Sequence, residues 1–159
     1  MVREVILVIA FGIPSFAQQT CPVTAGTPSA AFKPPAPYSS AAPGPGFWYG
    51  TRQLWTYIAP DPLHVGGPDK LSAKLAYWRV GFQWTAEYDP DLKVIAKRFD
   101  ARAALIESLP AHGIKFNGDD TPGGMAMGTG IAIPEPGCWQ IVATYKGIHT
   151  LSYFVRVIP

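Results

Sequence analysis

Two methionines separated by one residue offer the clearest candidate metal chemistry in this sequence. Met125 and Met127 stand in the segment Gly-Met-Ala-Met-Gly. On a strand, residues two apart point to the same face, and paired thioethers are soft ligands of the kind that copper(I) prefers. Methionine is also an ordinary filler of apolar cores. Because no third ligand can be identified, we favour core packing and keep copper binding as the alternative.

The remaining reactive side chains are too scattered to form a catalytic site. No HExxH pair, nucleophile elbow, phosphate loop or calcium-loop spacing occurs. The spacing typical of a metal site is absent both among the histidines His64, His112 and His149 and around the acidic pair Asp119 and Asp120. We expect no catalytic residue, no cofactor and no enzymatic activity.

Tryptophan is abundant for so short a chain. Five Trp occur among 159 residues. Aromatic rings exposed together on one sheet would form a platform for a sugar ring or a protein partner. Burial in the core is the more general role of Trp, but Trp48 and Trp55, beside Arg52, are predicted to form an exposed binding surface.

The two cysteines are Cys21 and Cys138. In an exported protein a disulfide between them is expected, and two free thiols are the alternative. A loop of that length would stabilise the fold by about 4–5 kcal/mol in the chain-entropy model.

The N-terminus predicts export. Residues 1–17 have a basic start, a short apolar run and small residues suited to cleavage after Ala17. The run is too short to span a bilayer, so no stable membrane insertion is expected after cleavage. A net charge of +2 is too small to favour nucleic acid as a partner. We predict a secreted or periplasmic protein.

A Pro/Ala/Ser/Gly-rich arm, residues 18–46, precedes the domain at 47–159. Short apolar and aromatic segments separated by Gly- and Pro-rich turns indicate about seven strands. Segments 47–50, 54–58, 75–80 with 82–84, 92–99 and 114–116 are strand candidates. Residues 101–109 tolerate helix as well, although an irregular strand is preferred.

Residues 139–157 give the clearest pattern. Apolar residues alternate with polar ones over two segments joined at Lys146-Gly147-Ile148-His149, which predicts an antiparallel hairpin with one buried face. The fold class expected is therefore all-β, an immunoglobulin-like antiparallel sandwich.

The segment from Pro134 to Trp139, with the hairpin after it, resembles the terminal hairpin of small secreted bacterial proteins with immunoglobulin-like domains, mostly uncharacterised. The early Cys21-Pro22 and the Leu54-Trp55 strand extend the resemblance. It implies a fold and a compartment, and no catalytic residues. The leading hypothesis is an exported, non-enzymatic binding or structural module for a protein or glycan of the cell envelope.

Overall fold

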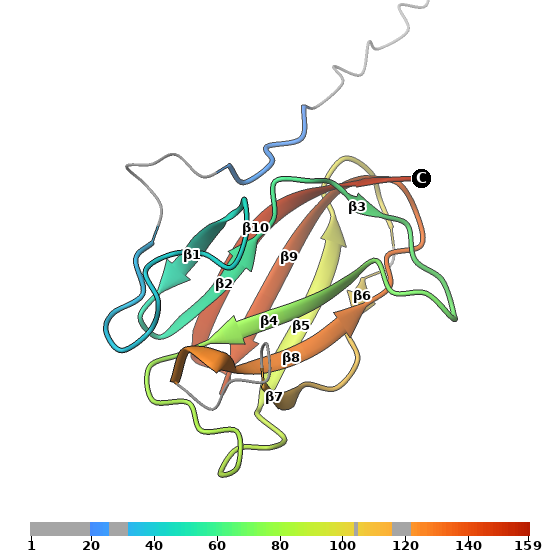
Figure 1. Ribbon diagram of the computed structural model, residues 1–159. Coiled ribbons are helices and arrows are strands. Elements are labelled where there is room, and N and C mark those ends of the chain that lie inside the picture. Colours follow the sequence, from blue (N-terminus) through green and yellow to red (C-terminus); the bar gives the residue numbers. More distant parts are fainter. Residues whose placement is uncertain (1–19, 26–31, 104, 116–121) are drawn as a thin grey trace, which may run out of the picture.

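Two five-stranded β-sheets face each other in the computed structural model, which describes residues 20–25, 32–103, 105–115 and 122–159 (Figure 1). The predicted signal, residues 1–17, lies outside the described residues. In spatial order, the first sheet contains β1 (Phe47–Thr51), β2 (Leu54–Ile58), β4 (Ala73–Trp78), β8 (Met125–Ile131) and β7 (His112–Lys115). The second contains β3 (Leu63–His64), β10 (His149–Ile158), β9 (Gly137–Tyr145), β5 (Leu92–Arg98) and β6 (Ile106–Glu107). A 3₁₀ turn, η2 (Pro122–Gly124), precedes β8.

The strand order is that of an immunoglobulin-like sandwich, as the sequence predicted. The order β2-β4-β8-β7 corresponds to strands A, B, E and D, and β10-β9-β5 corresponds to G, F and C. Among the strands of the described residues, every pair is antiparallel except β3 with β10, which is parallel. The described residues form ten strands rather than about seven, because the predicted strands did not include β8 and the pattern could not show two-residue strands such as β3 and β6.

The predicted antiparallel C-terminal hairpin and its buried face are confirmed, and His149 belongs to β10 rather than to the turn. His149 pairs with Tyr145 and Val157 with Gly137. Lys146 and Gly147 in the turn have φ of 51° and 68°, so the chain reverses through two left-handed residues. The predicted inward residues Trp139, Ile141, Ala143 and Tyr145 are all buried, with Gln140, Val142 and Thr144 less so.

Two connecting segments, residues 82–84 and residues 101–109, can be compared with the strands predicted for them. Residues 82–84 form a loop that enters a turn at Trp84 rather than a strand, and β4 ends at Trp78. Apart from residue 104, which is not described, residues 101–109 contain no helix, and β6 pairs with β5 at Ile106 and Glu107. Leu109 then donates its N–H to Gly130 of the first sheet at 2.8 Å, so this segment passes from one sheet to the other.

The arm is fastened to the domain at both of its described parts. Cys21 and Cys138 form the predicted disulfide, with Cα atoms 5.4 Å apart. Thr24 bonds β10 twice, through its N–H to the Phe154 carbonyl at 3.0 Å and through its hydroxyl from the Phe154 N–H at 2.8 Å. Phe32 donates its N–H to Trp48 of β1 at 3.2 Å, and the chain then crosses the outer side of the first sheet.

Candidate functional site

Trp48 and Trp55 lie on the outer face of the first sheet, but they are not exposed. Their exposed fractions are 8% and 0%. The prediction of an exposed Trp48–Arg52–Trp55 surface is therefore wrong for both tryptophans, while Arg52 is exposed in the β1–β2 turn. The physical reason is that the arm covers them, which the local pattern around either tryptophan does not reveal.

We call the covered group the aromatic cluster. Its buried members are Tyr38, Trp48, Trp55, Trp78 and Ala126, with Phe32, Ala42, Tyr57, Ala76 and Ile114 packed against them. The arm contributes the rings of Phe32 and Tyr38, whose centroids lie 5.5 and 5.0 Å from that of Trp55. The Tyr38 hydroxyl donates to the Arg79 carbonyl at 2.8 Å and accepts the Gly81 N–H at 2.7 Å. The arm thus occupies one half of the outer face.

The other half of that face is open and forms what we call the outer-face groove. It has a volume of about 480 Å³ and lies over β4, β8 and β7. Its lining is mainly apolar: Leu71, Lys74, Leu75, Ala76, Leu109, Pro110, His112, Ile114, Gly128, Thr129 and Gly130. A concave, mostly apolar hollow of this size on a rigid sheet is typical of a binding site.

Two glycines create the hollow. Gly128 and Gly130 lie at alternate positions of β8, so both face outward, and neither carries a side chain. A Cβ at Gly128 would lie 2.6 Å from a methyl of Ile114, and one at Gly130 would lie 2.5 Å from a methyl of Leu71. The two aliphatic side chains therefore sink onto the sheet, which lowers the floor of the groove.

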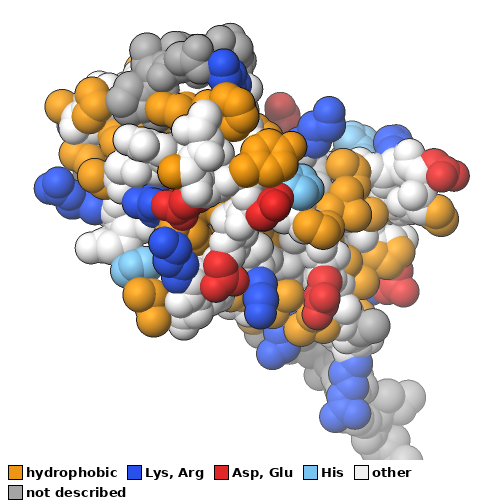
Figure 2. Space-filling view, turned by 90° about the horizontal axis from the view of Figure 1, so that it is seen from below, with side chains coloured by type: hydrophobic (Ala, Val, Ile, Leu, Met, Phe, Trp, Pro, Cys, Tyr) orange, Lys and Arg blue, Asp and Glu red, His pale blue; other side chains and the backbone are white. Residues whose placement is uncertain are grey.

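Exposed apolar side chains continue from the groove. Leu109, on its wall, is 56% exposed, and Tyr88, whose ring centroid lies 5.7 Å from that of His112, is 55% exposed. Asp89 accepts a hydrogen bond from His112 Nδ1 at 2.9 Å when that nitrogen is protonated. The underside of the molecule shows apolar side chains gathered beside a histidine and framed by charged groups (Figure 2).

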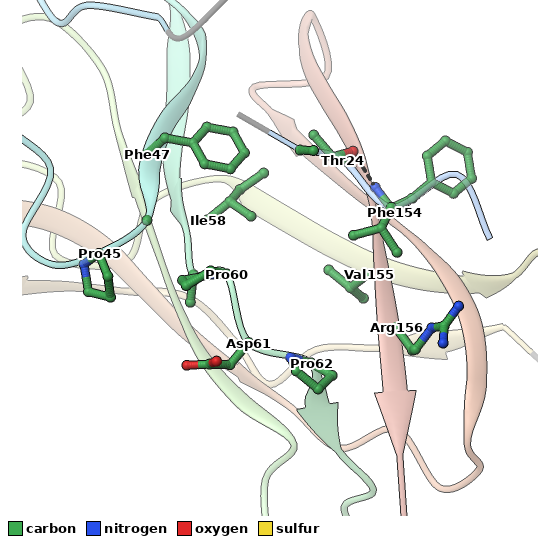
Figure 3. A pocket seen from close by; sticks show the side chains of 14 residues that line it. Thr24, Pro45, Phe47, Ile58, Pro60, Asp61, Pro62, Phe154, Val155 and Arg156 are labelled. Carbon is green, nitrogen blue, oxygen red and sulfur yellow. Dashed lines mark hydrogen bonds between the residues drawn. The ribbon is translucent and has the colours of Figure 1, made fainter. Parts of the chain in front are cut away.

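A second cavity, of about 440 Å³, opens at the edge of the sandwich between the arm, β10 and the end of β2 (Figure 3). Phe47, Ile58 and Val155 point into it, whereas Asp61 and Arg156 lie on its rim. Its wall includes Ala25, where the described part of the arm stops, so we assign this cavity no function.

Met125 and Met127 do share a face of β8, as predicted, and that face points into the core between the sheets. Met127 is fully buried and Met125 packs against the same cluster. These positions fit the core-filler interpretation. Among the described residues, no three His, Cys, Asp or Glu side chains gather as a metal site.

A charged network joins the β4–β5 loop to the hairpin. Glu87 pairs with Arg79 and accepts a hydrogen bond from the Tyr145 hydroxyl, while Lys146 Nζ lies 3.6 Å from its carboxylate. Burial acts to raise the pKa of Glu87, but the bond from Tyr145 and the charge of Arg79 outweigh it and lower that pKa. Because its charges are mutually paired, we interpret this network as structural.

A smaller network supports the disulfide. Asp100 accepts the Cys138 N–H at 3.0 Å and pairs with Arg98 at 2.8 Å. Burial opposes ionisation of Asp100, yet these hydrogen bonds and the charge of Arg98 lower its pKa. The strand bearing Cys138 is thereby held next to β5.

Comparison with protein-family models, curated proteins and solved structures finds no match. No helix in the described part of the chain has the length and apolarity needed to cross a membrane.

The sequence analysis did not predict the groove, although a signal existed. Glycines at alternate positions of an apolar strand, Gly128 and Gly130, mark a place where a sheet face lacks side chains.

Proposed function

We propose that this chain is an exported, non-enzymatic binding module that holds a protein of the cell envelope in its outer-face groove. The observation that carries the proposal is the uncovered apolar half of a sheet face whose other half is covered by the chain's own arm. A contiguous apolar surface open to solvent is costly unless it serves an interaction.

The lining favours a protein over a glycan. Lys74, Thr129 and His112 are the polar or ionisable side chains in it, while Leu71, Leu109, Pro110 and Ile114 offer only carbon. Sugar recognition needs several converging hydrogen-bonding groups, whereas apolar side chains of a partner need none.

Two further features support the compartment. The Cys21–Cys138 disulfide is compatible with an oxidising, extracellular compartment. Residues 1–17 have the composition of a secretory signal. We propose secretion or periplasmic residence, which mass spectrometry of the mature N-terminus would test; a chain that still begins at Met1 would contradict it.

Site-specific photo-crosslinking tests the groove. A photoreactive residue is placed at Leu109 in the full chain and, as a matched control, at Ile148, which is 75% exposed in the hairpin turn and does not line the groove. We expect a discrete adduct from position 109 and none from 148.

The crosslinked protein would then be identified, purified and titrated by calorimetry. Gly130→Leu, which fills the groove, and Leu109→Ser, which removes an exposed wall residue, should each weaken its binding about tenfold. Equal adducts from both positions, or affinity unchanged in both variants, would contradict the proposal.

A further inference from the structure

We infer that the occupant of the outer-face groove is a proline-containing segment that carries an aromatic ring with a carboxylate beside it. This inference rests on the proposed function and specifies the chemistry of the partner. Three observations lead to it: the continuity of the groove with the arm's own binding surface, the way in which the arm binds, and the charge that lines the groove.

The groove and the aromatic cluster are one continuous surface. Ala76 and Ile114 line the groove and also pack in the aromatic cluster. A segment lying in the groove would therefore extend the interface that the arm already makes, along the same outer face of β4, β8 and β7.

The arm shows which chain this face accepts. Its segment from Phe32 to Tyr38 ends in a turn, in which the Tyr38 N–H donates to the Pro35 carbonyl at 2.9 Å. The rings of Phe32 and Tyr38 both pack against Trp55, and Pro34 is buried. Prolines restrict the unbound chain, so that it loses less conformational entropy on docking, and aromatic rings supply most of the buried area. The same chemistry suits the adjoining apolar hollow, whose volume of about 480 Å³ is ample for a ring.

The charge comes from Lys74. Its side chain is exposed, it lines the groove, and within the described part of the chain it has no ion-pair partner. The carboxylate of Asp89 is hydrogen-bonded to His112, another residue that lines the groove. A carboxylate next to the inserted ring would complement Lys74, adding orientation more than affinity.

A synthetic peptide tests this chemistry. The probe has the sequence Phe-Asp-Pro-Pro-Ala-Pro-Tyr, which is that of residues 32–38 with Asp in place of Lys, and it is titrated into the isotope-labelled full-length protein while backbone amide and indole NMR signals are followed. We expect saturable shifts at Gly128, Thr129 and Gly130. Replacing both rings by Ala should weaken binding about tenfold or more, and replacing Asp by Lys should weaken it about threefold.

Protein variants locate the site. Lys74→Glu should reduce affinity for the Asp peptide and improve it for the Lys peptide, and Gly130→Leu should abolish both. Ile148→Ser should change neither. Because Gly130→Leu displaces Leu71, Leu109→Ser provides a second groove variant that alters only an exposed side chain.

The outcomes separate the inference from the function. The inference would be overturned if the NMR signals of residues 128–130 did not shift. It would also be overturned if only the indole signals of Trp48 and Trp55 shifted, as expected when the peptide displaces the arm. Crosslinking of an envelope protein at position 109 together with such a result would leave the proposed function standing. Peptide binding at the groove without any crosslinked partner would support the inference and contradict the function.

Discussion

The hydroxyl groups of Tyr77 on β4 and Tyr153 on β10 lie 3.0 Å apart in the core, so one hydrogen bond joins the two sheets. Both side chains are buried, with exposed fractions of 0% and 3%. Each hydroxyl satisfies the other in a region where a lone polar group would be costly.

Removing one partner should therefore destabilise the fold more than removing both. Tyr77→Phe leaves the Tyr153 hydroxyl without its partner and should lower the free energy of unfolding by about 1–3 kcal/mol. The double variant Tyr77→Phe, Tyr153→Phe should recover most of that loss. Urea denaturation measures both, and a double variant as unstable as the sum of the singles would contradict the pairing.

The same pair predicts alkaline sensitivity. Burial raises the pKa of Tyr77 well above 10.0 and that of Tyr153 to about 12. Between about pH 10 and 12 the unfolded chain loses these protons and the folded chain keeps them, so stability present below pH 10 is lost as pH rises. Melting temperature against pH should fall more steeply for the native protein than for the double Phe variant; equal slopes would contradict the prediction.

The lowered pKa of Glu87 predicts that the fold loses stability in acid. Its pKa is lowered from 4.5, so its contribution is present above pH 4.5 and is lost as pH falls through the lower folded value. Glu87→Gln should cost about 1–2 kcal/mol at pH 7 and flatten the loss of stability from about pH 4.5 downward. Glu107→Gln, at an exposed position of β6, is the matched control for the loss of a carboxylate and should change the free energy of unfolding at pH 7 by less than about 0.5 kcal/mol.

Trp55 should behave as a core residue. Trp55→Ala removes the surface on which Phe32 and Tyr38 rest and should cost about 3–5 kcal/mol, with faster proteolytic cleavage of the arm. Arg52→Ala, at an exposed position in the adjacent turn, should stay within about 0.5 kcal/mol. Full stability of Trp55→Ala would mean that the arm does not pack on the sheet in solution.

The disulfide should contribute mainly by restricting the unfolded chain. Replacing Cys21 and Cys138 together by Ser should lower the free energy of unfolding by about 2–5 kcal/mol. The arm should become more accessible to protease in the same variant. Two reactive thiols in the native, oxidised protein would contradict the bond.

The methionines should tolerate replacement by Leu. Met127→Leu is a volume-conserving change and should cost less than about 1.5 kcal/mol. Copper(I) binding should not differ between the native protein and the Met125→Leu, Met127→Leu variant. One equivalent of copper that only the native protein binds would instead support the copper alternative.

The sequence was sufficient to predict the hairpin and its buried face, because the inward and outward alternation of residues 139–157 depends only on the local pleat of a strand. It also indicated the Cys21–Cys138 pairing, since only two cysteines are present. The solvent exposure of Trp48 and Trp55 depends on tertiary structure. Both side chains point out of the sandwich, but Phe32 and Tyr38 of the arm cover them. The groove also depends on tertiary structure, because Gly128 and Gly130 form a hollow only when Leu71 and Ile114, from two other segments, pack against them. Local patterns specify which face a side chain takes, and only long-range packing specifies what covers that face.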